Sequence, residues 1–114
     1  MAVYSKIALS GSTNGRPILI TQAATAGTAI HTASTVVDEV WIWAWNSNAS
    51  AQLFTVEYGG VTDPNDILEI TLPVNTAGST LVVPGWIATG SIAIAGFAAN
   101  ANEVTIFGYV NRIT

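Results

Sequence analysis

Three tryptophans alternate with aliphatic residues in one short segment, and this alternation constrains the fold more than any other feature of the chain. Trp41, Trp43 and Trp45 occupy every second position. Successive side chains of a β-strand point to opposite faces of its sheet, so the indoles line one face and Val40, Ile42 and Ala44 the other. Burying an indole removes roughly 150–250 Å² from water, an upper estimate of about 4–6 kcal/mol. Both faces therefore need a cover, from a second sheet, an oligomer partner or a larger assembly.

The composition indicates one domain with an unusually neutral surface. The chain has 114 residues, of which 50% are hydrophobic and only 9% charged, against about 25% charged in an ordinary soluble domain. That length suits a single core. Because small neutral residues hold positions that charged residues normally occupy, much of the outer surface is expected to meet other protein.

The charge balance argues against nucleic acid and membranes as partners. The net charge is −4, and only Lys6, Arg16 and Arg112 are positive, so no basic patch is available for phosphates or anionic lipids. No apolar run reaches the roughly 20 residues of a spanning helix, and the first residues lack a secretory signal. We therefore expect a soluble protein. The absence of cysteine excludes disulfides and constrains the compartment only weakly.

Short apolar or alternating runs, separated by turn residues, predict an all-β, single-domain β-sandwich with about eight short antiparallel strands. Eight strands also fit a jelly roll, and the sequence leaves that choice open. Almost no helix is expected. The predicted runs are Pro17–Gln22, Thr28–Ala33, Glu39–Trp45, Gln52–Tyr58, Asp66–Leu72, Thr80–Val83, Ser91–Ala98 and Glu103–Val110.

Two local features add detail. In the run from Gln52 to Tyr58, the face with Leu53, Thr55 and Glu57 is mixed and could be wet. Pro84-Gly85 favours a tight turn, over which the Trp86 indole is expected to pack.

Residues 1–15 precede the sandwich domain of residues 16–114 and have two interpretations. They contain Tyr4, Ile7 and Leu9, followed by a flexible polar stretch. The segment is either an ordinary edge strand or an extended N-terminal arm that pairs with a neighbouring subunit by strand addition.

Catalytic and metal-binding motifs are scarce, and we expect no enzyme, no cofactor and no metal. His31, the only histidine, has no cysteine or second histidine beside it and is interpreted as structural. No serine lies in a nucleophile elbow. Asp63, Asp66 and Glu69 could in principle hold calcium, but their spacing is not that of an EF-hand and suits turn chemistry. Asp38-Glu39 are interpreted as gatekeepers that keep the tryptophan segment soluble.

A tryptophan strip could also be a stacking platform for sugars. Sugar sites carry a few placed polar groups that bond hydroxyls. The nearest here are Asn46, Asn48 and Gln52. Carbohydrate binding is therefore kept as an alternative.

Six blocks of the chain resemble the small virion proteins of tailed bacteriophages. Trp43 and Trp45 make this chain richer in indoles than that pattern. The blocks are Val3–Ser10, Ile30–Ala33, Asp38–Trp41, Val56–Gly60, Val82–Gly85 and Gly108–Asn111.

The resemblance implies a head decoration, or cement, protein. Such a protein is made in the host cytoplasm, lies on the capsid surface of the virion and locks major capsid subunits together, commonly as a homotrimer. The alternative within the virion is a tail- or fibre-associated module, with a carbohydrate-binding role for the aromatic strip. The residues expected at interfaces are Tyr4, Ile7, Leu9, Trp41, Trp43, Trp45 and Trp86, with the three tryptophans of the strip in the core or in a trimer interface.

Overall fold

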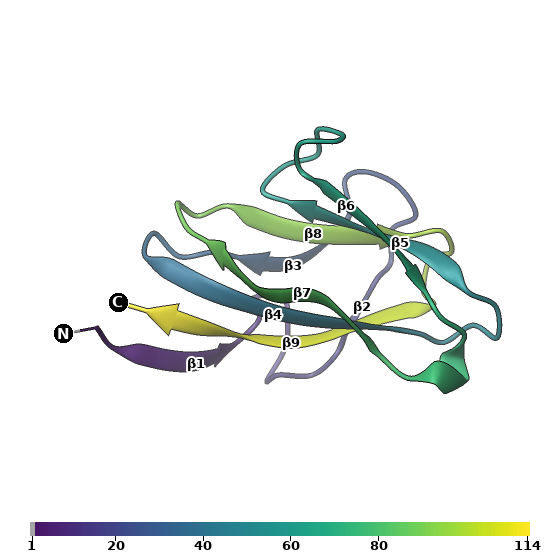
Figure 1. Ribbon diagram of the computed structural model, residues 1–114, viewed down its shortest axis with the longest axis horizontal. Coiled ribbons are helices and arrows are strands. Elements are labelled where there is room, and N and C mark those ends of the chain that lie inside the picture. The colour runs from purple at the N-terminus through teal and green to yellow at the C-terminus, as the bar shows by residue number, and fades with distance from the viewer. Residues whose placement is uncertain (1) are drawn as a thin grey trace.

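The computed structural model describes residues 2–114 as nine strands and one short 3₁₀ helix (Figure 1). All strand pairs are antiparallel. The predicted all-β sandwich is confirmed, and each of the eight predicted runs overlaps a strand. The elements are β1 (Tyr4–Ala8), β2 (Ile18–Leu19), β3 (Thr28–Thr32), β4 (Val37–Asn46), β5 (Gln52–Tyr58), β6 (Ile67–Leu72), η1 (Asn75–Ala77), β7 (Thr80–Ala88), β8 (Ala93–Ala98) and β9 (Val104–Ile113).

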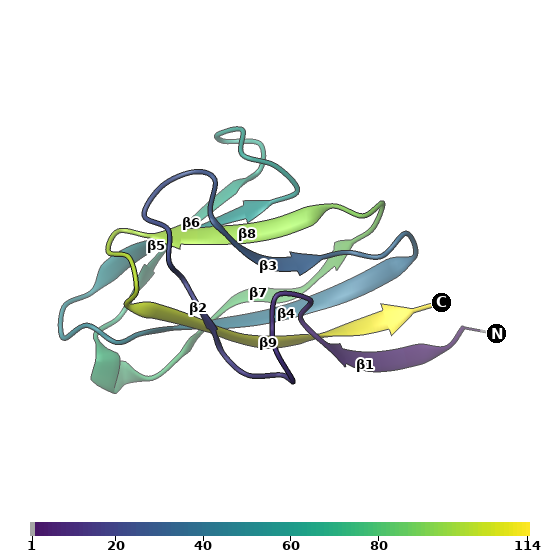
Figure 2. The same ribbon diagram turned by 180° about the vertical axis from the view of Figure 1, so that it is seen from behind.

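The strands form two sheets that lie face to face (Figures 1 and 2). Sheet A has the order β1-β9-β4-β7, with β2 also paired to β9, and sheet B has the order β3-β8-β5-β6. The chain is one long folded hairpin: β5 pairs with β6, β4 with β7, β3 with β8, and β1 and β2 with β9. Because successive pairs alternate between the sheets, the topology is that of a jelly roll.

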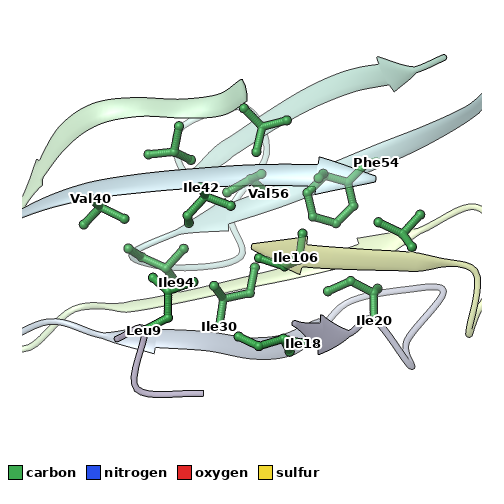
Figure 3. Packing of buried hydrophobic residues seen from close by; sticks show 14 of the residues in the cluster. Leu9, Ile18, Ile20, Ile30, Val40, Ile42, Phe54, Val56, Ile94 and Ile106 are labelled. Carbon is green, nitrogen blue, oxygen red and sulfur yellow. The ribbon is translucent and has the colours of Figure 1, made fainter. Parts of the chain in front are cut away.

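Aliphatic side chains fill the space between the sheets (Figure 3). On β4 every second residue is buried, and these residues include Val40, Ile42 and Ala44. Phe54 and Val56 of β5 enter the same core from sheet B, fully buried. Sheet B is therefore the cover for the aliphatic face of the tryptophan strand, and the indole face points outward.

The Pro84-Gly85 pair lies inside β7, so the predicted tight turn is wrong. Gly85 has φ +74°, and the register with β4 shifts at this point, between Val40 and Trp41. A glycine with positive φ that leaves one strand with an extra residue is a β-bulge. Proline is tolerated because β7 is an edge strand and needs no donor there. Trp86 continues the strand and does not pack over a turn.

The outer face of β5 is exposed at Leu53, 41%, but not at the two polar positions where water was expected. Thr55 and Glu57 are only 4% and 2% exposed. Both oxygens of the Glu57 carboxylate accept 2.7 Å hydrogen bonds, one from the Thr25 hydroxyl and one from the Gly27 amide. The loop before β3 therefore covers this part of sheet B.

The N-terminal segment forms β1, the edge strand of sheet A. β1 pairs with β9, and reciprocal backbone hydrogen bonds join Val3 to Thr114, so the two ends of the described chain lie together (Figure 2). Beyond β1 the chain turns against β3, where the Gly11 amide donates to the Ile30 carbonyl at 2.9 Å. A Cβ at Gly11 would lie 2.6 Å from the Ala29 oxygen, so only glycine fits this approach.

Candidate functional site: the outer face of sheet A

The outer surface of sheet A, here called the aromatic face, carries side chains in rows that run across the strands. Residues paired across neighbouring strands share a face, so the register fixes its members. The three tryptophans of β4 are half-buried, while other members are well exposed: Leu81 42%, Ile87 56%, Phe107 41% and Tyr4 71%. The face consists of Tyr4, Lys6, Ala8, Leu19, Val37, Glu39, Trp41, Trp43, Trp45, Leu81, Pro84, Ile87, Thr105, Phe107, Tyr109, Asn111 and Ile113.

Trp41, Trp43 and Tyr109 form a compact aromatic cluster at the middle of this face. Their ring centroids are 6.1–6.5 Å apart in all three pairs, with interplanar angles of 19–29°. The benzo ring of Trp41 extends over Gly85, where a Cβ would lie 2.7 Å from its Cζ2 atom. The rings thus cover one another in part. The alternative that placed these tryptophans in the core is wrong, because sheet B covers the opposite face of β4.

Hydrogen bonds hold the polar edges of the cluster. One Glu39 oxygen accepts from Trp41 Nε1 at 2.8 Å and from Asn111 Nδ2 at 3.0 Å. These two bonds lower the pKa of Glu39. The Lys6 ammonium lies 4.2 Å from the centroid of the Tyr109 ring, a cation–π contact. Trp45 Nε1 donates to the Asn75 carbonyl of η1 at 2.9 Å.

Trp86 lies apart from this cluster, at the edge between the two sheets. Its ring meets Tyr58 edge-on, with centroids 5.5 Å apart, and the Tyr58 hydroxyl donates to the Ile87 carbonyl at 3.1 Å. Burial, with the charge of Asp38, raises the pKa of Tyr58 to about 12. An open pocket of about 280 Å³ lies beside this pair, lined also by Asn65, Asp66, Ile67 and Leu68.

The N-terminal residues expected at interfaces have three different surroundings. Tyr4 is 71% exposed, Ile7 is half-buried and packs against the core, and Leu9 is 2% exposed. Leu9 is a core residue (Figure 3), and its assignment to an interface is corrected. Leu9 is on the same inward side of the chain as Ile7. Its side chain enters the core because the chain leaves β1 after Ala8 and crosses toward sheet B.

The interpretation of Asp38 as a gatekeeper is also wrong, because Asp38 is fully buried. Arg112 donates to both of its oxygens, at 2.8 and 3.0 Å. His31 Nε2 lies 2.9 Å from Oδ2, and Ser34 donates through its amide and hydroxyl. Burial alone would raise the pKa of Asp38, but the bonds from Arg112, His31 and Ser34 outweigh it and hold the pKa well below its ordinary value.

His31 is placed for structure and not for base catalysis. It is 2% exposed, and its Nδ1 atom accepts a hydrogen bond from the Ser10 amide at 3.0 Å. An Nδ1 that accepts leaves the proton on Nε2, which donates to Asp38. Both ring nitrogens are thus occupied, and no lone pair is left to take a proton from a substrate.

The polar groups nearest the tryptophan strip are occupied by one another. Gln52 Nε2 donates to Asn46 Oδ1 at 2.8 Å and to Glu103 at 3.0 Å. Asn48 Nδ2 donates to the same Glu103 oxygen at 2.8 Å, and Asn46 Nδ2 donates to two backbone carbonyls. This network fixes the connection between β4 and β5, so the predicted polar partners Asn46, Asn48 and Gln52 are engaged within the chain.

The acidic segment after β5 is built as a turn. The Asp66 carboxylate accepts from the Thr62 amide at 3.1 Å, and the Asp66 amide donates to the Thr62 carbonyl at 2.8 Å. Within residues 2–114 no group of three or more His, Asp or Glu side chains is arranged to hold a metal ion. Over the same range, no helix is long and apolar enough to cross a membrane.

Sequence reasoning missed Lys6, Glu39, Tyr109 and Asn111 as members of the site. The alternation of the last strand puts Tyr109 and Asn111 on one face with Phe107. What the sequence does not contain is the pairing of that strand with β4, which brings Tyr109 beside Trp41.

Comparison with known proteins adds no relative: the chain matches no family model, no curated protein and no solved structure.

Proposed function

We propose that this chain is a non-enzymatic structural protein of a bacteriophage particle. It is a decoration protein that binds the outside of the head and stabilises contacts between major capsid subunits. The virion surface is its location and the major capsid protein and its own copies are its partners. The virus-specific part of this proposal comes from the sequence resemblance, and the structural part from the aromatic face.

The observation that carries the structural role is the uncovered aromatic face. Large exposed apolar patches on small domains mark surfaces that meet another molecule. Here the patch occupies one whole sheet, and its centre is a self-packed aromatic cluster of the kind enriched in protein interfaces. Burial of many such faces across subunit junctions would oppose bursting of a filled head without any bond-making chemistry.

The interior supports a structural role in a second way. Its charged and polar groups are bonded to one another, as in the Asp38 cluster and the Glu103 network. Among the described residues the one buried side-chain polar atom without a partner is Thr105 Oγ1. Thr105 belongs to the aromatic face, so this exception lies outside the two buried networks.

The carbohydrate-binding alternative has less support, because the polar groups predicted for it, Asn46, Asn48 and Gln52, are bonded within the chain. A host-glycan titration of tryptophan fluorescence tests it directly. A saturable change with one glycan class would favour the tail or fibre module over the decoration protein.

The direct test uses heads of the encoding phage prepared without this protein. The purified chain is mixed with the heads, and bound copies per head and the temperature of DNA release are measured. We expect saturable binding in a fixed ratio to capsid subunits and a higher release temperature. Absence of binding at micromolar protein would refute the proposal.

A further inference from the structure

Strand β9 divides the aromatic face into a thin half and a bulky half. The β4 side carries the three tryptophans, whereas the β1 and β2 side carries one large aromatic residue, Tyr4, at its end. Phe107 pairs with Trp43 on β4 but has no partner on β1 or β2, so the thin half has a gap beside Phe107. The rows across β9 are Tyr4–Ile113–Val37, Lys6–Asn111–Glu39, Ala8–Tyr109–Trp41 and Leu19–Thr105–Trp45; in the first of them the larger side chain is on β1.

From this asymmetry we propose that the aromatic face is the interface between two copies of the chain, related by a two-fold axis that runs along β9. Such an axis places the β1 and β2 side of the face against the β4 side in the second copy, because a two-fold interface is self-complementary. The row of side chains on β7 lies outside this overlap. Ala8 then faces Trp41 of the second copy, and Leu19 faces Trp45. The inference rests on the proposed structural function and names the partner of its main surface.

Charge complementarity supports a second copy as the occupant. Lys6 and Glu39 are the two charged residues of the face, and neither forms an ion pair within the described part of the chain. The two-fold axis brings Lys6 opposite Glu39 of the second copy, twice. The chain as a whole carries −4, so two copies repel over most of their surfaces, but the aromatic face is neutral. Sheet B, by contrast, carries exposed Glu69 on its outer surface.

The size of the face fits a reversible dimer. β4 and β9 are ten residues long, and an axis along β9 overlaps three strands of each copy, β1, β9 and β4, so the shared area measures about 33 by 14 Å, or roughly 460 Å². A standard interface buries about 800 Å² on each partner, and smaller ones are weak and transient. Two sheets pack face to face about 10 Å apart with their strands within roughly 30° of each other, which the axis along β9 permits. We therefore expect pairing that depends on concentration.

The test is the absolute mass of the full chain in solution, by light scattering behind a sizing column from micromolar to near-millimolar concentration. The mass should rise from that of one chain, 11.8 kDa, toward twice that value. A single-chain mass throughout, or a stable trimer, would overturn the two-fold interface. Binding to heads would still be measurable, so failure of the inference and failure of the proposed function are separable.

Charge exchange then tests the register. Glu39→Lys and Lys6→Glu should each weaken dimerisation by about tenfold or more, and the double exchange should restore most of it. Glu69→Lys makes the same change of net charge on sheet B and should leave the dimer intact. Because Glu39→Lys also removes hydrogen bonds from Trp41 and Asn111, circular dichroism checks its fold. Failure of the double exchange to recover any affinity would refute the facing of Lys6 and Glu39.

A second pair of variants keeps the test independent of those bonds. Phe107 on the axis and Leu53 on the outer face of sheet B are each 41% exposed. Phe107→Ser should weaken the dimer by at least tenfold, as expected for a central aromatic residue, and Leu53→Ser should not. Equal effects, or none from Phe107→Ser, would contradict the interface.

Discussion

At the scale of single residues, the tryptophans of β4 have a different energetic role from the aliphatic residues between them. Val40 and Ile42 are fully buried, but the indoles are half-buried on the outside. Trp41 and Trp43 are stabilised by each other and by Tyr109, and Trp45 by its hydrogen bond to Asn75. The sequence predicts the alternation and the need for two covers. It does not say which face meets the second sheet, because both faces are apolar.

Trp43→Ala is therefore expected to destabilise the isolated chain only modestly. Loss of its aromatic pairs and part of its buried area should lower the unfolding free energy by about 1–2 kcal/mol. Phe54→Ala, in the core, should cost about 3–5 kcal/mol. Urea unfolding at dilute protein concentration compares the two, and equal losses would place Trp43 in the core after all.

The Asp38 cluster gives a prediction for pH. The folded pKa of Asp38 is depressed well below the ordinary value of an aspartate, so its contribution to stability is fully present above the unfolded pKa and is lost as pH falls through the folded one. In the Asp38→Asn variant, the unfolding free energy should fall much less steeply with decreasing pH below about pH 4 than it does in the original chain. Glu69→Gln, at an exposed site, is the control. An unchanged acid limb in Asp38→Asn would show that the carboxylate is not ionised in the folded chain.

Breaking the same cluster from the other side should be costly. Arg112→Met leaves a fully buried carboxylate with His31 and Ser34 but without its cation. We expect a loss of about 3 kcal/mol at neutral pH, measured by urea unfolding. A change below about 0.5 kcal/mol would mean that water replaces the guanidinium. Sequence reasoning missed this cluster because the pairing of β4 with β9 brings Arg112 to Asp38, and the packing of sheet B on sheet A brings His31 of β3.

At the scale of elements, the β7 bulge supports the aromatic cluster. Glycine is required at position 85 for two reasons: its φ is +74°, and the Trp41 ring above it leaves no room for a Cβ. The sequence signal, Pro84-Gly85, predicts a turn equally well, since the same backbone conformation serves turns and bulges. Tertiary pairing with β4 decides between them.

Gly85→Ala separates these two requirements when compared with Gly78→Ala. Gly78 also has a positive φ, +85°, but no atom within 4 Å of the site of a Cβ. Both substitutions carry the conformational cost of about 1 kcal/mol; Gly85→Ala should cost about a further 1 kcal/mol or more by displacing Trp41. Equal losses in thermal or urea unfolding would show that the indole moves away freely.

At the scale of the whole molecule, strand positions were accessible from the sequence, but topology and site composition were not. Turn residues and period-two runs locate eight strands because those signals are local. The jelly-roll order, the edge position of β1 and the inward path of Leu9 depend on contacts between distant segments. The aromatic face exists for the same reason, since β9 contributes Tyr109 and Phe107 to the tryptophans of β4.

Both proposals require that protein covers the aromatic face in the assembled state. Hydroxyl-radical labelling of the tryptophans measures this directly, first at a concentration where the chain is monomeric and then on decorated heads. We predict that labelling of Trp41 and Trp43 falls several-fold on assembly, while Trp86, at the edge between the sheets, serves as the reference within the same chain. Labelling of Trp41 and Trp43 that stays at the monomer level on the heads would contradict the account.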